Sequence, residues 1–265
     1  MAQESEWAEV ESYDLPGSRV SVVIRRSPDG VAGLYEMLGG GFLPNQVVAV
    51  VGPPGGGKTI AMLQFLHANA SLGRKCLLVS AADEEESIVT YSQTFGLDFQ
   101  PFLQSGQMRI VTVRMMDAGS GLPTNILERL PGLISQSGAE VIGIDSITEF
   151  QDMCDSDMER KGRTIDLRWQ IKATGATALI IAEAGGPPGI SKYGIIEYVA
   201  DGVVLQSRLT SEDGSETLHV VQVLKMRWLN HPKEIRAYRV TARGLEVLSP
   251  LYTALASSGK KRKDS

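Results

Sequence analysis

Cysteine and histidine are scarce in this sequence, and long apolar runs are missing. The 265 residues include two cysteines and three histidines, too few for a disulfide framework and without the spacing of a Cys/His metal site. No apolar run approaches the roughly 20 residues that a membrane helix needs. The acidic start MAQESEWAEVESYD lacks the apolar core that secretory signals carry. We therefore expect a cytoplasmic protein without membrane insertion.

An excess of basic residues is also missing. Lysine and arginine number 26 against 31 acidic residues, a formal net charge of −5, whereas a dedicated nucleic-acid binder presents a basic face. Basic residues do gather at Lys260–Lys263, and we expect residues 251–265 to form a flexible basic tail. Such a tail either docks onto phosphates or serves as a solubilising end, and the second interpretation is favoured. A nucleic-acid partner is therefore disfavoured but stays open.

Apolar segments alternate with helical segments through the first two thirds of the chain. With 43% hydrophobic and 22% charged residues, the composition is that of a globular protein with a sizeable core. Short apolar runs are typical of strands buried on both faces of a parallel sheet. These runs are Val47–Val51, Cys76–Ser80, Met108–Val113, Val141–Asp145 and Thr177–Ala182. Because helical segments such as Thr59–Ala70 separate them, we predict an α/β fold, a mostly parallel sheet with helices on both faces.

The last third of the chain has a different pattern. Val203–Leu209 and Thr217–Lys225 flank a polar Asp-Gly turn, which predicts an antiparallel hairpin. Ile235–Val240 and Gly244–Leu248 predict a second hairpin. We therefore expect the parallel sheet to be extended by C-terminal antiparallel strands.

A phosphate-binding loop follows the first apolar run. The stretch fits G-x-x-x-x-G-K-[ST] at every position, with a buried strand before it and a helix after it. Its residues are Gly52, Pro53, Pro54, Gly55, Gly56, Gly57, Lys58 and Thr59. Glycines allow successive backbone N–H groups to surround phosphate oxygens at a helix N-terminus. The motif predicts that Lys58 contacts the β- and γ-phosphates of ATP as a catalytic group, and that the Thr59 hydroxyl is a ligand of Mg²⁺.

A second part of the site is predicted at the end of a later strand. Val141–Asp145 is an apolar strand that ends in a carboxylate, the Walker B arrangement in which the acid holds Mg²⁺ through its water shell. Many buried strands end in aspartate, so the pattern gains its weight from the phosphate-binding loop upstream. We expect Asp145 and Thr59 to share the metal, with ATP and Mg²⁺ as the cofactors.

Several segments in a fixed order carry a family resemblance. They are Gly30–Leu34, Leu38–Gly41, the phosphate-binding loop, Ile144–Thr148, Thr177–Glu183, Tyr193–Asp201 and Lys225–Arg227. In this order they resemble the RecA superfamily of P-loop ATPases, and within it the branch of the circadian-clock ATPase KaiC. The resemblance covers about residues 28–250 as a single RecA-like ATP-binding domain. Residues 1–27 then form an N-terminal extension, in which Val20–Ile24 favours a short strand.

The resemblance implies a homo-oligomer with nucleotide at the borders between subunits, often a hexameric ring. On that basis Lys225 and Arg227 reach the γ-phosphate of a neighbouring subunit as catalytic fingers, where arginine neutralises charge that develops on the transferred phosphoryl group. From the residues alone, the favoured interpretation is that both side chains are solvated and alternate outward on an edge strand. Phe102–Gln107 and Leu245–Ala256 also resemble the nucleotide-binding subunit of the archaellum motor, which belongs to the same branch.

The chain departs from the family pattern at a pair of glutamates. In the family, the strand after the phosphate-loop helix leads into two glutamates, one of which activates the attacking water. Here Ala82 and Asp83 occupy these positions. Alanine cannot orient water, so the shorter Asp83 is the remaining candidate for the catalytic base. The acidic run Glu84–Glu86 is alternatively the first turn of a helix, where the helix dipole favours acids. Loss of a positioned base typically costs about 10²–10⁴ in rate, so slow hydrolysis or none is expected.

Three functions are consistent with these residues. The first is a regulatory KaiC-like ATPase with slow turnover, whose ATP state controls ring assembly or the docking of an unidentified protein partner. The second is a motor-associated subunit, as in the archaellum, that binds ATP without hydrolysing it, which Ala82 favours. The third is a recombinase-like DNA-repair ATPase. It is disfavoured because Gly185–Lys192 carries one lysine and no aromatic residue on which single-stranded nucleic acid could stack.

Overall fold

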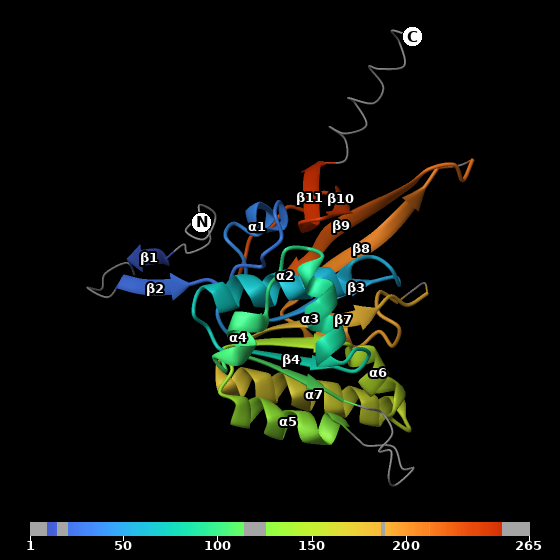
Figure 1. The fold of residues 1–265 in the computed structure, drawn as a ribbon. Coiled ribbons are helices and arrows are strands. Elements are labelled where there is room, and N and C mark those ends of the chain that lie inside the picture. The colour runs from blue at the N-terminus through green and yellow to red at the C-terminus, as the bar shows by residue number, and fades with distance from the viewer. Residues whose placement is uncertain (1–9, 15–20, 114–125, 187–188, 212, 251–265) are drawn as a thin grey trace.

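The centre of the fold is a parallel sheet. The computed structural model describes residues 10–14, 21–113, 126–186, 189–211 and 213–250. Nine strands in these ranges form one sheet in the order β11-β10-β9-β8-β3-β7-β6-β4-β5 (Figure 1). Its central parallel strands are β3 (Val47–Gly52), β4 (Cys76–Ser80), β5 (Met108–Thr112), β6 (Val141–Asp145) and β7 (Thr177–Glu183). Every residue of β3 and β4 is buried, as expected for apolar strands that are covered on both faces.

The other edge of the sheet is antiparallel. Its strands are β8 (Gly202–Thr210), β9 (Thr217–Met226), β10 (Arg236–Thr241) and β11 (Gly244–Pro250). β8 lies parallel to β3, and β9, β10 and β11 then follow in antiparallel order. The hairpin of β8 and β9 extends beyond the body of the molecule (Figure 1). The predicted α/β fold, with a mostly parallel sheet extended by C-terminal antiparallel strands, is confirmed.

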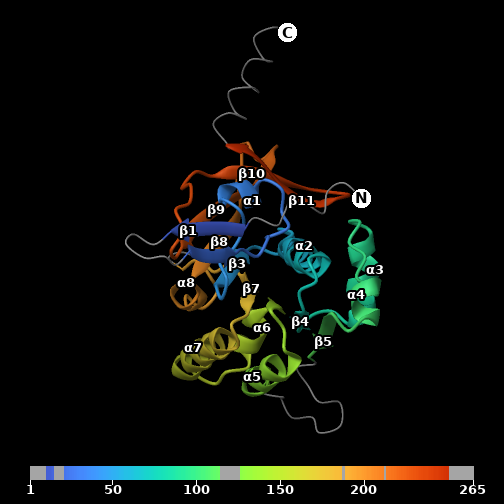
Figure 2. The same ribbon diagram turned by 90° about the vertical axis from the view of Figure 1, so that its left-hand side faces the viewer.

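Helices cover both faces of the parallel strands. In chain order they are α1 (Leu34–Met37), α2 (Lys58–Ser71), α3 (Glu85–Gln93), α4 (Gln100–Gln104), α5 (Ile126–Ser137), α6 (Ile147–Asp152), α7 (Asp157–Thr174) and α8 (Ile196–Val199). Figure 2 shows α2 on one side of the sheet and α5 and α7 on the other. Within the described ranges, no helix is both long and apolar enough to cross a membrane.

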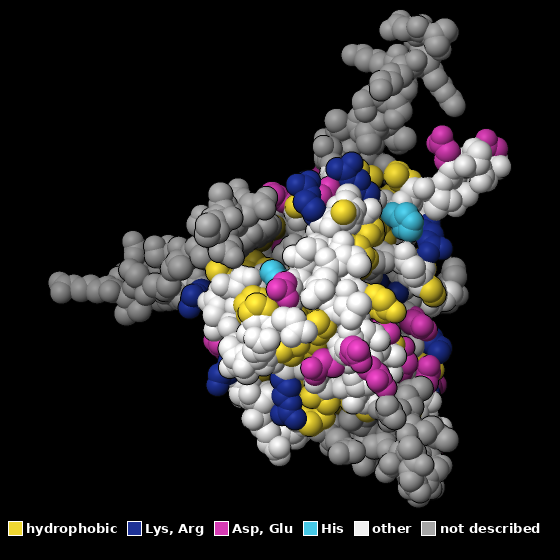
Figure 3. Space-filling view, viewed as in Figure 1, with side chains coloured by type: hydrophobic (Ala, Val, Ile, Leu, Met, Phe, Trp, Pro, Cys, Tyr) yellow, Lys and Arg dark blue, Asp and Glu magenta, His cyan; other side chains and the backbone are white. Residues whose placement is uncertain are grey.

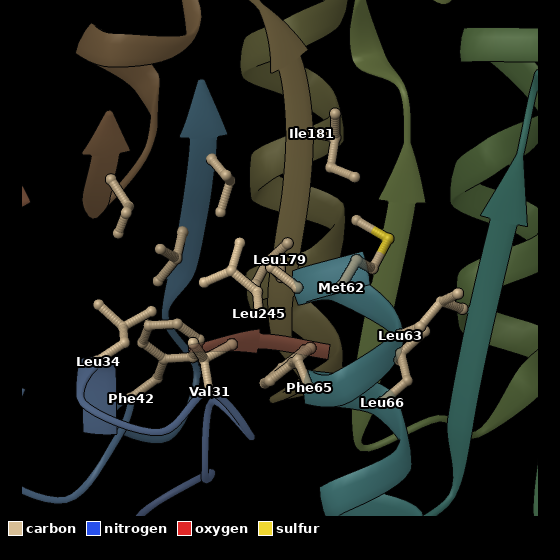
Figure 4. Packing of buried hydrophobic residues seen from close by; sticks show 14 of the residues in the cluster. Val31, Leu34, Phe42, Met62, Leu63, Phe65, Leu66, Leu179, Ile181 and Leu245 are labelled. Carbon is tan, nitrogen blue, oxygen red and sulfur yellow. The ribbon is translucent and has the colours of Figure 1, made fainter. Parts of the chain in front are cut away.

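Two hydrophobic cores hold these layers together. On one face, Met62 and Leu66 of α2 pack with Leu179 of β7 (Figure 4). On the other face, Leu167 and Ile171 of α7 pack against the opposite side chains of the same sheet. Each fully buried aliphatic side chain stabilises the fold by roughly 1.5–3 kcal/mol relative to an exposed one. The cores therefore fix α2 relative to β3 and so fix the loop that joins them.

The N-terminal residues that the structure describes form a separate antiparallel pair. β1 (Val10–Asp14) pairs with β2 (Ser21–Arg25), so the short strand lies one residue later than the pattern predicts. The segment after β2 contacts the residues that follow α2: the buried Arg74 guanidinium donates hydrogen bonds to the Ser27 hydroxyl and the Arg26 carbonyl. The predicted tail, residues 251–265, lies outside the described residues.

Candidate nucleotide-binding site

The sheet topology brings the two predicted halves of the site to one edge. β3 leads into the loop of residues 52–59, β6 ends at Asp145, and β7 lies between these two strands. The three strands are parallel, so their carboxyl ends meet at the same edge, where ligands bind in open α/β sheets. Gly52 is the register partner of Glu183, the last residue of β7. The loop and the Walker B strand are therefore neighbours at that edge.

The glycines of the loop are required by its backbone and by close neighbours. Gly57 is the N-cap residue of α2 and has a φ of 83°, a left-handed conformation that glycine adopts at little cost. Gly56 is approached from β8 and β10, since a Cβ atom there would lie 3.1 Å from Gln206 Oε1 and 3.3 Å from the Tyr238 hydroxyl. The glycines therefore keep a bare backbone at the N-terminus of α2, the arrangement that binds phosphate.

The Lys58 ammonium folds back onto the loop. Its Nζ atom donates hydrogen bonds to the carbonyl oxygens of Gly52 at 2.9 Å and Pro53 at 3.0 Å. Burial lowers the pKa of Lys58, and the nearby carboxylates of Asp145 and Glu183 oppose that shift. The predicted phosphate-binding cation thus lies within a compact group of charges at the carboxyl edge of the sheet.

The two predicted metal ligands are in direct contact. The Thr59 hydroxyl donates a 2.7 Å hydrogen bond to Asp145 Oδ2. Burial raises the pKa of Asp145, and the hydrogen bond from Thr59 opposes the rise. Mg²⁺ takes oxygen ligands from one or two protein groups together with substrate phosphates and water. The residues present therefore fit a magnesium–nucleotide ligand, with Thr59 and Asp145 as the groups that would hold the metal.

Asp83 lies beside this pair of ligands. Asp83, Thr59 and Asp145 line one small cavity. The Asp83 backbone is fixed there, because its N–H donates to the Ser80 hydroxyl at 3.0 Å. The side chain of Ala82 is exposed and offers no functional group. The structure thus brings the predicted base candidate close to the predicted metal ligands.

The acidic run after Asp83 begins a helix. Glu84 is the N-cap residue of α3, and Glu85 and Glu86 lie in its first turn, where the helix dipole favours negative charge. All three side chains are exposed, and Figure 3 shows acidic side chains gathered on the face that carries α3. Glu84–Glu86 therefore begin a helix, and of the four consecutive acids Asp83 is the one that lines the cavity with Asp145.

Two further carboxylates adjoin the site. Glu149 lies in the first turn of α6 and accepts a hydrogen bond from the hydroxyl of Ser146, the residue after Asp145. Glu183 ends β7, and its backbone N–H donates to the Thr148 hydroxyl at 2.9 Å. The family resemblance pointed to the end of β7. Sequence reasoning missed Glu149, because a single glutamate on a short helix carries no distinguishing pattern.

The antiparallel strands supply one wall of the loop. Arg208 of β8 donates a hydrogen bond to the Pro54 carbonyl, and Tyr238 of β10 donates one to the Gly56 carbonyl at 2.7 Å. The partners are 154 and 182 residues apart in the sequence. Sequence reasoning missed both residues, because no local pattern indicates contacts between such distant segments.

Lys225 and Arg227 are bound within their own chain. The Lys225 ammonium donates to the carbonyl oxygens of Glu197 at 3.2 Å and Ala200 at 2.7 Å. Arg227 forms an ion pair with Asp201 at 3.1 Å. β9, which carries Lys225, lies between β8 and β10. β10 pairs only with Val220 and Val221 of β9, so the segment that carries Lys225 has β8 as its one partner strand in the described sheet. Both side chains are half-buried and paired within the chain, so they are not simply solvated.

Both residues lie near the amino-terminal end of β3, whereas the loop follows the carboxyl end of this strand. Asp201, the partner of Arg227, also accepts a 3.0 Å hydrogen bond from the backbone N–H of Val47 at the start of β3. From Val47 to Gly52 an extended strand rises roughly 16 Å. Within one chain, the predicted fingers are thus separated from the phosphate-binding loop by the length of β3.

The fold and the site together define a P-loop nucleotide-binding protein of the RecA type. Strand β3, the loop and α2 provide the phosphate site, and β6 provides the acid that contacts the predicted metal ligand Thr59. A family model described as "ATPase: KaiC" matches residues 27–252, most of the chain. The chain therefore belongs to the KaiC family of ATPases.

Known proteins agree with this assignment. The chain is 24% identical over 224 residues to the circadian clock oscillator protein KaiC of Acaryochloris marina, covering 82% of this chain and 42% of that protein. It is 26% identical over 238 residues to a UPF0273 protein of Methanocaldococcus jannaschii, covering 84% and 96%. A crystal structure of a KaiC-like protein from Pyrococcus horikoshii has the same fold, with a TM-score of 0.73, 24% identity, and coverage of 85% and 100%.

The length of these relatives limits what is transferred from them. The chain spans less than half of the Acaryochloris KaiC protein, whereas it spans nearly all of the Methanocaldococcus protein and all of the Pyrococcus structure. The family assignment covers the ATPase domain. What the whole clock proteins do is not carried over to this chain by the match.

Proposed function

We propose that the chain binds Mg·ATP at this site, hydrolyses it slowly, and uses the bound nucleotide to control its assembly or the docking of a protein partner. The observation that carries the proposal is the 2.7 Å contact between Thr59 and Asp145 beside the Lys58 ammonium. Hydroxyl, carboxylate and ammonium groups gathered at a helix N-terminus each match one part of a metal–triphosphate ligand.

Different groups of the chain are proposed to bind the phosphates and the metal of Mg·ATP. Backbone N–H groups of the loop bind phosphate oxygens, and Lys58 exchanges its bonds to Gly52 and Pro53 for bonds to the β- and γ-phosphates. Thr59 and Asp145 hold Mg²⁺, which when bound neutralises phosphate charge. ATP is the proposed nucleotide because the chain belongs to a family of ATPases.

Slow turnover follows from the residues after β4. Ala82 is exposed and has no group that accepts a proton. Asp83 shares a cavity with Thr59 and Asp145, so it is the group proposed to orient the attacking water. Loss of a well-placed general base typically costs about 10²–10⁴ in rate, and a shorter carboxylate is expected to recover part of that loss.

A homo-oligomer with nucleotide at its subunit borders is also part of the proposal. Lys225 and Arg227 lie at the opposite end of β3 from the loop of their own chain. Arg227 pairs with Asp201, and Asp201 accepts a hydrogen bond from the first residue of β3. They can therefore act on a phosphate only across a border between two copies. A hexameric ring is the form that the family resemblance implies.

The test combines Mg·ATP turnover with a light-scattering mass in the same sample. We expect the mass to rise with Mg·ATP, slow phosphate release to accompany it, and both to disappear in Lys58→Ala. In Asp83→Asn, turnover should fall while ATP binding and the rise in mass remain. A mass that is the same with and without Mg·ATP, or ATP binding that survives Lys58→Ala, would contradict the proposal.

A second candidate function is a motor-associated subunit that binds ATP without hydrolysing it. The specific observation in its favour is that residue 82 is an exposed alanine, where the family resemblance leads us to expect a glutamate. This function predicts ATP-dependent assembly with no phosphate release above the level of Lys58→Ala. Measurable turnover that is lost in Lys58→Ala would exclude it.

A further inference from the structure

Arg208 lies at the phosphate-binding loop but comes from a distant part of the sheet. β8 changes from buried to exposed around this residue, where the hairpin of β8 and β9 leaves the body of the molecule (Figure 1). The Nη2 atom of Arg208 donates to the Pro54 carbonyl, and a Cβ atom on Gly55 would lie 3.1 Å from the same atom. Among the described residues, no carboxylate forms an ion pair with Arg208. Its positive charge is therefore presented to the loop.

Lys58 and Arg208 bind successive carbonyl groups of that loop. The Lys58 ammonium binds those of Gly52 and Pro53, and the Arg208 guanidinium binds the next one, on Pro54. Burial is the largest cause that lowers the pKa of Lys58, and the charge of Arg208 adds to it. Two cations converge on one short segment of backbone, so an anion bound there is attracted by both.

We propose that Arg208 contacts the terminal phosphate of the bound nucleotide and so makes the site selective for a nucleoside triphosphate over a diphosphate. This inference rests on the proposed function, because it requires nucleotide in the loop. The ammonium of a P-loop lysine lies at the β- and γ-phosphates, and Arg208 approaches the same loop segment as Lys58 from the wall formed by β8. The phosphate nearest to both cations is the terminal one.

The chemistry of arginine fits this role better than a purely structural one. A guanidinium carries five N–H donors in a planar fork that matches two phosphate oxygens at once. The bond to Pro54 accounts for one contact of that fork, and a neutral donor is sufficient for such a contact, as Tyr238 shows at Gly56. The exposed position of Arg208 allows the remaining donors to turn toward a phosphate.

Arg208 also differs from the other two cations assigned to the phosphates. Lys225 and Arg227 are separated from their own loop by the length of β3, so they require a neighbouring copy. Arg208 reaches the loop within one chain. Its selectivity for the triphosphate is therefore a property of the single subunit and does not depend on assembly.

The experiment measures Mg·ATP and Mg·ADP affinities by calorimetry for the wild type, Arg208→Ala and Arg208→Gln. Glutamine keeps a side-chain N–H donor for Pro54 but removes the charge. In both variants we expect ATP affinity to fall by about tenfold to hundredfold, as for loss of a hydrogen bond to a charged group, while ADP affinity changes by less than about threefold. Arg239→Ala is the matched control, because Arg239 lies on β10, is exposed and pairs with Glu246.

Three results would overturn the inference. They are an equal loss of ATP and ADP affinity, restoration of ATP affinity by glutamine, and unchanged affinities in both variants. The first two would indicate that Arg208 only stabilises the loop through its bond to Pro54, and the third would indicate that Arg208 has no role at the site. Failure of the proposed function is seen separately, because wild-type protein would then bind no ATP or Lys58→Ala would still bind it. Thermal unfolding of each variant identifies any loss of fold, and Arg208→Gln tests the inference if Arg208→Ala does not fold.

Discussion

The Tyr238 hydroxyl donates a 2.7 Å hydrogen bond to the carbonyl of Gly56, which joins the C-terminal antiparallel strands to the phosphate-binding loop. Tyr238 is 3% exposed, and its ring meets the imidazole of His219 edge-on at 5.4 Å between centroids. Burial raises the pKa of Tyr238 to about 12. The hydroxyl therefore stays protonated at neutral pH and is available as a donor to the loop.

The first prediction concerns this bond. Tyr238→Phe should lower the free energy of unfolding by about 0.5–1.5 kcal/mol, because the Gly56 carbonyl loses its buried donor, and should weaken Mg·ATP binding by loosening the loop. Urea unfolding and calorimetric titration measure the two effects. Thr174→Val is the control, since it removes a 2.7 Å bond to Ile171 at the end of α7. The control should lose stability without losing nucleotide affinity. Equal ATP affinity in Tyr238→Phe and wild type would show that the bond does not shape the site.

The contribution of Tyr238 also shows where sequence reasoning stops. The loop and its flanking strand and helix were predictable because their pattern is local, as in Gly52–Thr59 and Val47–Val51. The meeting of Thr59 and Asp145 was predictable because parallel strands place their carboxyl ends at one edge. Arg208 and Tyr238 were not predictable, since alternating strands carry no information about which distant backbone they approach.

The position of Lys225 and Arg227 was a second limit. Their order in the chain suggested fingers, and their alternation suggested outward side chains. The structure gives both residues partners within the chain, because the end of β9 lies beside α8 and the residues that follow this helix. Strand order decides whether a strand is an edge, and strand order is set by tertiary packing, which a single sequence does not display.

The second prediction concerns Asp29, whose carboxyl group is buried in the turn before α1. Its Oδ1 atom accepts a 2.9 Å bond from the Val31 N–H, and its Oδ2 atom has no hydrogen-bond partner among the described residues. Burial raises the pKa of Asp29 from 3.8 to about 8. The stability that its protonated form supports is therefore complete below about pH 4 and is lost as the pH rises through about 8.

Asp29→Asn should remove this dependence, because asparagine keeps the acceptor for Val31 and does not ionise. Relative to wild type, the free energy of unfolding of the variant should rise by more than about 1.4 kcal/mol between acidic and mildly alkaline pH, the equivalent of one pKa unit. Urea unfolding near pH 5 and near pH 8 measures the difference. A constant difference between the two proteins at both pH values would mean that Asp29 ionises in the folded protein as it does in the unfolded chain.

The third prediction separates a finger from a structural ion pair. Arg227 and Arg168 both bind Asp201, at 3.1 and 2.8 Å, but the Arg227 side chain is 40% exposed and that of Arg168 is 16% exposed. Asp201 also binds Lys172. Arg227→Ala should reduce ATP turnover by at least about tenfold in the assembled protein, because an arginine that neutralises phosphoryl charge is removed. ATP binding to the single subunit should remain.

Arg168→Ala is the matched control for that change. It removes a more buried partner of the same aspartate, so it should lower stability at least as much as Arg227→Ala while leaving turnover per assembled subunit unchanged. Thermal unfolding and phosphate release, measured on the same preparations, give both quantities. If the two variants lose turnover in equal proportion to their stability, Arg227 is a structural ion pair and acts on no neighbouring nucleotide.

The last prediction places a glutamate at position 82, where the family resemblance leads us to expect one. Ala82 is exposed between β4 and α3, so a longer side chain is accommodated without disturbing the core. Ala82→Glu places a carboxylate next to Asp83, which lines a cavity with Thr59 and Asp145, and should raise Mg·ATP turnover by about tenfold to hundredfold, within the range that a positioned general base contributes. Ala82→Gln is the isosteric control, because its amide cannot accept the proton of the attacking water. If turnover rises in Ala82→Glu but not in Ala82→Gln, the slow turnover of the wild type is due to the absence of a base at position 82. Equal rates in both variants and wild type would show that a carboxylate at position 82 does not contribute to turnover, which would leave Asp83 as the proposed base.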